Sequence, residues 1–92
     1  MQLGKLKARF VVNLTDMGSG SIELFDDGVQ INIGRARTVP YNYIERVEKT
    51  GELPLGKVGV TLHFFDPFGN RERTEFAMRD NDFRALQNAL RK

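Results

Sequence analysis

The stretch that decides the fold closes the chain: Thr74-Glu75-Phe76-Ala77-Met78, followed by the segment from Asp80 to Lys92. In the first part, the side chains expected to face inward recur at every second residue, which is typical of a β-strand with one buried face. In the second part, Phe83, Leu86 and Leu90 fall on one stripe of a helix. We therefore predict a last strand that leads into a single amphipathic C-terminal helix.

The same period of two recurs upstream, in segments separated by turn residues. Asp66-Pro67-Phe68-Gly69 suits a type I turn followed by a left-handed glycine, and Asp26-Asp27-Gly28 suits a tight type I′ hairpin. The composition of residues 15–20 and 51–56 predicts loops. The positions expected to be buried are 6, 8, 10, 12, 14, 22, 24, 29, 31, 33, 58, 60, 62, 64, 74, 76 and 78, with Phe83, Leu86 and Leu90 packed on them.

Length and composition predict one small globular domain over residues 1–92. The 92 residues contain no cysteine, 40% hydrophobic residues and 28% charged residues, with a net charge of +2. No apolar run is long enough for a signal peptide or for the roughly 20 residues of a membrane span. We expect a cytoplasmic protein. The chain stops where the predicted helix stops, as a domain excised from a longer protein would.

Seven strand-like segments and one terminal helix resemble the pleckstrin-homology-like superfamily, in its prokaryotic or GRAM-like form. The segment Val39-Pro40-Tyr41-Asn42-Tyr43-Ile44-Glu45-Arg46-Val47 is similar to a hydrophobic-Pro-Tyr/Leu-x-x-Ile-x-x-Val signature of these domains. The strand at 74–78 running into residues 82–86 is similar to their closing strand and helix. The resemblance implies a mainly β fold, with seven antiparallel strands in a partly open barrel of two sheets that the C-terminal α-helix caps. It implies no particular ligand, because the superfamily binds lipids, peptides and proteins.

The residues give no sign of catalysis. His63 is the only histidine, and no second metal ligand or catalytic partner stands at a recognisable spacing from it. Gly18-Ser19-Gly20 lacks the Lys-Ser/Thr of a phosphate-binding P-loop. We expect no enzyme activity, no cofactor and no metal, and we interpret the chain as a binding or adaptor module.

Four apolar residues stand where polar ones are expected. Phe65 should face outward because Phe64 faces inward, Phe68 lies in a turn, and Leu53 and Leu55 lie in a predicted loop. Exposed apolar clusters mark contacts with partners, so these four form a candidate surface for another protein or for a second copy of this chain. The competing interpretation is that Phe65 and Phe68 cover each other or the edge of the core.

A basic patch supplies the alternative hypothesis, in which the protein is a peripheral module on anionic lipid headgroups. The residues concerned are Lys5, Lys7, Arg9, Arg35 and Arg37. Ordinary solvated charge explains them as well. The loop at 15–20 contains no basic residue and Glu23 follows it, so we expect no tight phosphoinositide binding. A nucleic-acid partner is disfavoured because the outward aromatic residues are not interleaved with the basic ones.

Overall fold

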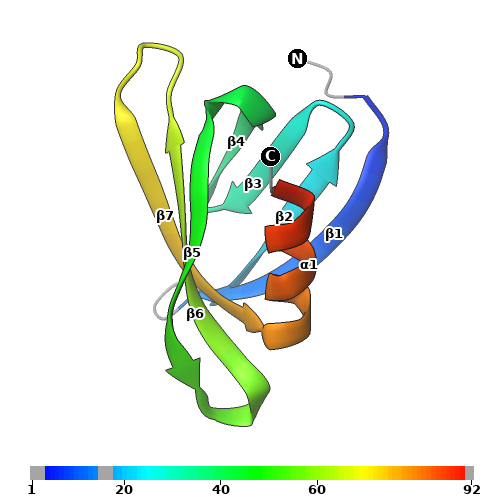
Figure 1. Ribbon diagram of the computed structural model, residues 1–92, viewed down its shortest axis with the longest axis vertical. Helices are drawn as coiled ribbons and strands as arrows, with labels where there is room; N and C mark the ends of the chain where they lie inside the picture. The colour runs from blue at the N-terminus through cyan, green and yellow to red at the C-terminus, as the bar shows by residue number, and fades with distance from the viewer. Residues whose placement is uncertain (1–3, 15–17, 91–92) are drawn as a thin grey trace.

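The computed structural model describes residues 4–14 and 18–90. The predicted seven strands and single C-terminal helix are confirmed (Figure 1). Residues 15–17 of the loop predicted over 15–20 and the last two positions of the predicted helix lie outside the described residues. The strands are β1 (Leu6–Leu14), β2 (Gly18–Phe25), β3 (Gly28–Ile33), β4 (Arg35–Pro40), β5 (Ile44–Leu53), β6 (Lys57–Phe65) and β7 (Arg71–Arg79). Two short 3₁₀ helices, η1 (Tyr41–Tyr43) and η2 (Pro54–Gly56), flank β5, and α1 (Asp80–Leu90) follows β7.

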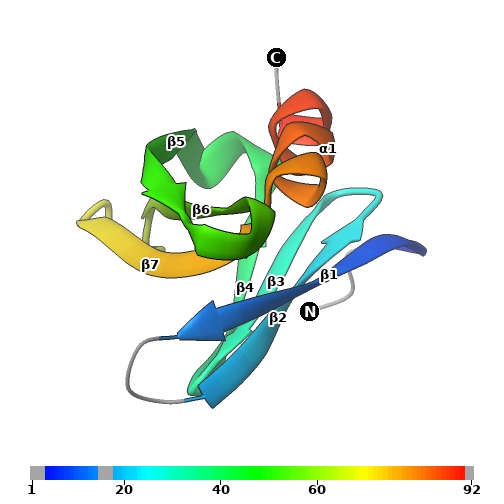
Figure 2. The same cartoon turned by 90° about the horizontal axis from the view of Figure 1, so that it is seen from below.

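All seven strands belong to one antiparallel sheet in the order β4-β3-β2-β1-β7-β6-β5. The expectation of two sheets is therefore wrong. The strands form one sheet because Asn13 of β1 pairs with Ala77 of β7, and this pair joins the first four strands to the last three. The sheet curls around α1 but does not close, because β4 and β5 are its two edges and do not pair with each other (Figure 2).

The core lies inside this curl. Most positions expected to be buried are buried, including Val12, Ile22, Leu62 and Met78. Leu6 is 52% exposed, and four further positions of the predicted set are only half-buried: Ala8, Leu14, Ile33 and Thr74. The register between β1 and β2 shifts between Leu6 and Ala8, so the alternation read through Phe10 and Val12 does not continue to the start of the strand.

Helix α1 lies across the concave side of the sheet, where it contacts β5, β6 and β7. Its apolar stripe explains this position, since Phe83 and Leu86 are buried against the core and Leu90 is half-buried. Asp80 begins the helix, where a carboxylate complements the positive end of the helix dipole. The same carboxylate forms an ion pair with Arg84 at 3.0 Å, one turn further along.

Two segments predicted as loops from their glycines are partly strand. Residues 18–20 belong to β2, and residues 51–53 extend β5. A Cβ on Gly20 would lie 2.5 Å from the carbonyl oxygen of Asn32, so glycine is required there by the close approach of β3. The tight hairpin between β2 and β3 exists, but neither Asp26 nor Asp27 has a positive φ, so the predicted type I′ turn is wrong.

We predict that Leu86→Ala destabilises the protein by about 2–5 kcal/mol, because it removes buried methyl groups and leaves a cavity under the helix. Urea denaturation followed by circular dichroism measures the change. The neighbouring Gln87 is exposed, and Gln87→Ala should stay within about 0.5 kcal/mol of the wild type. A loss below about 1 kcal/mol for Leu86→Ala would mean that α1 does not complete the core.

Candidate functional site

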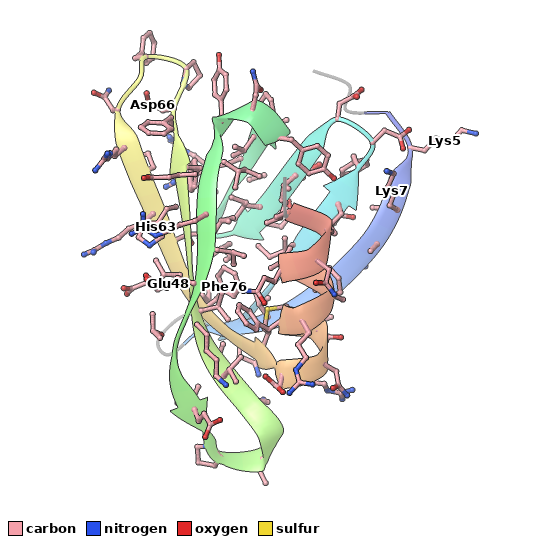
Figure 3. The ribbon with its side chains drawn as sticks, viewed as in Figure 1. Lys5, Lys7, Glu48, His63, Asp66 and Phe76 are labelled. Carbon is pink, nitrogen blue, oxygen red and sulfur yellow. The ribbon has the colours of Figure 1, made fainter. Side chains whose placement is uncertain are left out.

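Asp66 fixes the turn between β6 and β7 through both carboxylate oxygens. Oδ1 accepts hydrogen bonds from the backbone N–H of Phe68 at 2.9 Å and of Asn70 at 2.8 Å. Oδ2 accepts one from the side-chain amide of Asn70 at 3.1 Å. The N–H of Gly69 donates to the Asp66 carbonyl at 3.0 Å, and Gly69 has a φ of 86°, as the predicted turn requires. The turn therefore presents its tip in a defined conformation (Figure 3).

These bonds change the acidity of Asp66. Partial desolvation is the largest single influence and by itself raises the pKa of the carboxyl. The hydrogen bonds from Asn70, Phe68 and Gly69 together outweigh it, so the pKa lies below its ordinary value of 3.8. The carboxylate at neutral pH is thus the form that holds the turn.

The two aromatic residues of this hairpin differ in exposure. Phe68, at the tip, is 89% exposed. Phe65 is half-buried on the outer face of β6, where it pairs in register with Arg71, and the guanidinium carbon of Arg71 lies 5.9 Å from the centre of its ring. Phe65 therefore already has a cation–π contact within the chain, and Phe68 is the aromatic side chain that is available to a partner.

The structure does not bring Leu53 and Leu55 to the same place. They lie at the β5–β6 hairpin, at the opposite end of β6 from Phe68 (Figure 1). The nine residues of β6 separate the two hairpins by about 30 Å of extended chain. Leu53 is 44% exposed and Leu55 is 93% exposed. The four apolar residues thus form two separate tips.

Leu55 also has an unusual backbone. Its φ of 64° makes it the one non-glycine residue with a positive φ among residues 4–14 and 18–90. This left-handed conformation costs an L-residue with a branched side chain about 1–2 kcal/mol. Leu55 is almost fully exposed, so its side chain contributes little to the core that would offset this cost.

The five basic residues of the alternative hypothesis do not form one patch. Arg9 is in register with Glu23, Gln30 and Thr38 across the sheet, so these side chains share the outer face. Arg37, one residue before Thr38, therefore lies on the inner face, in register with the buried Ile31.

Arg35 lies two residues from Arg37 and shares its face. Lys5 and Lys7 lie at the start of β1, far from the β6–β7 hairpin in Figure 3. The ammonium group of Lys7 is 3.7 Å from a carboxylate oxygen of Asp26. Lys5 and Lys7 therefore lie on a different part of the surface from Arg35 and Arg37.

A groove of about 460 Å³ runs between β4 and the β6–β7 hairpin. Arg35 and Arg37 line one wall, while Phe64 and Glu72, which pair in register on the inner face, line the other. The guanidinium carbon of Arg37 lies 6.0 Å from the centre of the Phe64 ring. The remaining lining residues are Thr38, Val39, Pro40, Tyr43, Phe65, Asp66 and Pro67.

Sequence reasoning did not identify this groove. Its walls come from segments more than twenty residues apart in the sequence, and nothing in either segment alone shows that they face each other. One feature of the sequence does indicate it, the alternation along β4. Val39 is apolar and buried, and Arg37 and Arg35 lie on the same face because they follow at two-residue steps. Two arginines on the inner face of an edge strand are the feature that points to the groove.

His63 has a structural partner. Its Nε2 lies 3.3 Å from a carboxylate oxygen of Glu48 on the neighbouring strand β5 (Figure 3). Within residues 4–14 and 18–90, no group of three histidine, cysteine, aspartate or glutamate side chains is placed to hold a metal ion. Over the same ranges, no helix combines the length and the apolar character needed to cross a membrane.

A scan against protein-family models matches none of them, and a search of the curated proteins returns no match.

We predict that Leu55→Asn raises the free energy of unfolding by about 1 kcal/mol, because asparagine adopts the left-handed conformation more readily than leucine. Urea denaturation measures the gain. Leu53→Asn is the control, since Leu53 has an ordinary φ of −121° and should show no such gain. Equal or lower stability of Leu55→Asn would show that the leucine side chain compensates for the strain.

A second prediction concerns the acid range. The pKa of folded Asp66 lies below that of the unfolded chain, so its hydrogen bonds contribute full stability above the ordinary pKa of 3.8 and lose it as the pH falls through the folded value. In an NMR titration, the amide shifts of Phe68 and Asn70 should move together with a midpoint below 3.8. Asp66→Asn should abolish that transition. A midpoint at or above 3.8 would contradict the assignment.

Proposed function

We propose that this protein is a non-enzymatic binding module of pleckstrin-homology-like fold that acts through protein–protein contacts. The observation that carries the proposal is Phe68, an aromatic side chain that is 89% exposed at the tip of the turn fixed by Asp66. Its partner is another protein or a second copy of this chain.

The physical basis of the proposal is the combination of exposure and rigidity. A single exposed apolar residue is common on protein surfaces. Phe68, however, stands on a turn whose backbone is held from both sides, so little backbone entropy is lost when a partner covers the ring. Aromatic anchors of this kind carry most of the binding energy at protein interfaces.

The surroundings of Phe68 extend the contact area. Pro67 beside it is exposed, and the groove next to the hairpin offers the half-buried Tyr43 and Phe65 as further apolar surface. An apolar anchor next to a concave, partly polar cleft is a usual arrangement for binding a partner segment. The resemblance in sequence supports the same class of function, because peptide and protein binding are among the roles of the superfamily it implies.

The geometry favours this proposal over the membrane hypothesis. A headgroup site needs several cations on one face, whereas Arg9 lies on the outer face of the sheet and Arg35 and Arg37 lie on the inner face. Lys7 is already close to Asp26. We therefore retain protein contact as the single proposed function.

The test is selection of displayed random peptides on the immobilised protein, with sedimentation equilibrium to detect self-association. We expect either a convergent peptide motif or a concentration-dependent dimer. Phe68→Ser should weaken either one by at least about tenfold, because an aromatic anchor is worth about 2 kcal/mol or more.

Leu55→Ser is the matched control, because Leu55 is equally exposed but lies at the other end of β6. It should leave binding unchanged. The proposal fails if neither a convergent motif nor a dimer is found with the wild type, or if Phe68→Ser has no more effect than Leu55→Ser.

A further inference from the structure

The free edge of β4 forms one rim of the groove. Within the described part of the chain, β4 pairs with β3 alone, through six residue pairs from Gly28↔Pro40 to Ile33↔Arg35. In an antiparallel ladder, alternate residues of an edge strand direct their N–H and C=O groups away from the sheet. Five of the six residues of β4, from Arg35 to Pro40 without Ala36, line the groove. The cleft therefore follows the unpaired edge of the strand.

The charge on this edge has a definite spacing. Arg35 and Arg37 are two residues apart, so both lie on the inner face, and both line the groove. Both are exposed, and within residues 4–14 and 18–90 neither forms an ion pair. The guanidinium carbon of Arg37 lies over the Phe64 ring, 6.0 Å from its centre.

We propose that an extended acidic peptide segment binds here by adding to the edge of β4, with carboxylates at alternate residues facing Arg35 and Arg37. The inference rests on the proposed protein-binding function and names its mode and its ligand chemistry. Side chains directly opposite each other on adjacent strands lie about 4.5–5.5 Å apart at Cβ, a separation at which arginine and glutamate pair well.

Three features favour a peptide strand over another anionic ligand. The arginines have the two-residue period of a strand, the backbone of β4 offers hydrogen bonds along the same line, and the groove volume of about 460 Å³ lies within the range of roughly 300–1,000 Å³ usual for ligand clefts. Pro40 lacks an N–H and ends the strand, which limits the added pairing to residues 35–39. Glu72 on the opposite wall disfavours further acidic side chains there.

The probe is a capped eight-residue peptide of alternating Glu and Val, titrated into ¹⁵N-labelled protein at low salt. We expect shift changes centred on residues 35–39 and slower hydrogen exchange of amides in β4. The double variant Arg35→Glu with Arg37→Glu should weaken binding by at least about tenfold, because two attractive cross-strand pairs become repulsive. Glu72→Gln should strengthen binding.

Two controls separate strand addition from general charge attraction. Lys7→Glu with Arg9→Glu makes the same change in net charge outside the groove and should leave the affinity within about twofold. An alternating Lys and Val peptide should not bind. N-methylation of single peptide bonds should weaken binding at every second position, because only alternate N–H groups pair with β4.

The outcomes distinguish this inference from the proposed function. Binding that is lost on charge reversal at Arg35 and Arg37 and that shows the two-residue N-methyl pattern supports strand addition. Binding without that pattern, or equally weakened by the Lys7 and Arg9 variant, overturns it. Absence of peptide binding also overturns it, while a motif or dimer that depends on Phe68 would leave the protein-binding function standing. Sedimentation with anionic vesicles that depends on Arg35 and Arg37, without peptide binding, would assign the arginines to lipid instead.

Discussion

The structure depends on one joint in the sheet, the pairing of β1 with β7 at Asn13 and Ala77. Without this pairing, the described strands would form two separate sheets, one of four strands and one of three. At this joint the strands β4-β3-β2-β1 turn against β7-β6-β5, and both sets then direct their apolar side chains at the same interior. Burial of that interior is the main favourable term in folding, and Phe83 and Leu86 of α1 complete it from the remaining side.

The joint also determines where the molecule is open. A sheet that curls from one joint without closing leaves a seam beside its edge strand β4. The edge strand β4 lies on one side of this seam and the β6–β7 hairpin on the other, with Arg37 reaching over Phe64 between them. The groove is thus a direct result of the incomplete closure, because it runs along the edge of β4 that no other described strand pairs with.

The sequence predicted the parts of the fold that depend on local pattern. The alternation of β6 and β7, the helical stripe of Phe83 and Leu86, and the left-handed glycine at position 69 all follow from neighbouring residues. The predictions that failed depended on contacts across the sheet. Gly20 was interpreted as part of a loop, but it stands in β2, and it is a glycine there because Asn32 of β3 leaves no room for a side chain. Leu6 was assigned to the core, although the bulge beside it interrupts the alternation.

The candidate site shows the same division. The outward position of Phe65 and the exposure of Phe68 followed from alternation and turn type. The separation of Leu55 from Phe68 depends on β6 running its full length between two hairpins, which the composition of the loops does not show. The opposite faces of Arg9 and Arg37 depend on the register through β2 and β3. The pattern of residues therefore could not predict the distances between residues that are remote in the sequence.

The two arginines of β4 have a further consequence for how this protein behaves at high concentration. Free sheet edges are the places where separate molecules join into aggregates, and charged side chains that point inward are one of the devices that prevent it. If the β4 strands of two copies met edge to edge, Arg35 and Arg37 of each would lie against those of the other on the same face, and the four positive charges would repel. Solubility should then decline as salt screens that repulsion, so this edge is protected by charge rather than by a covering element.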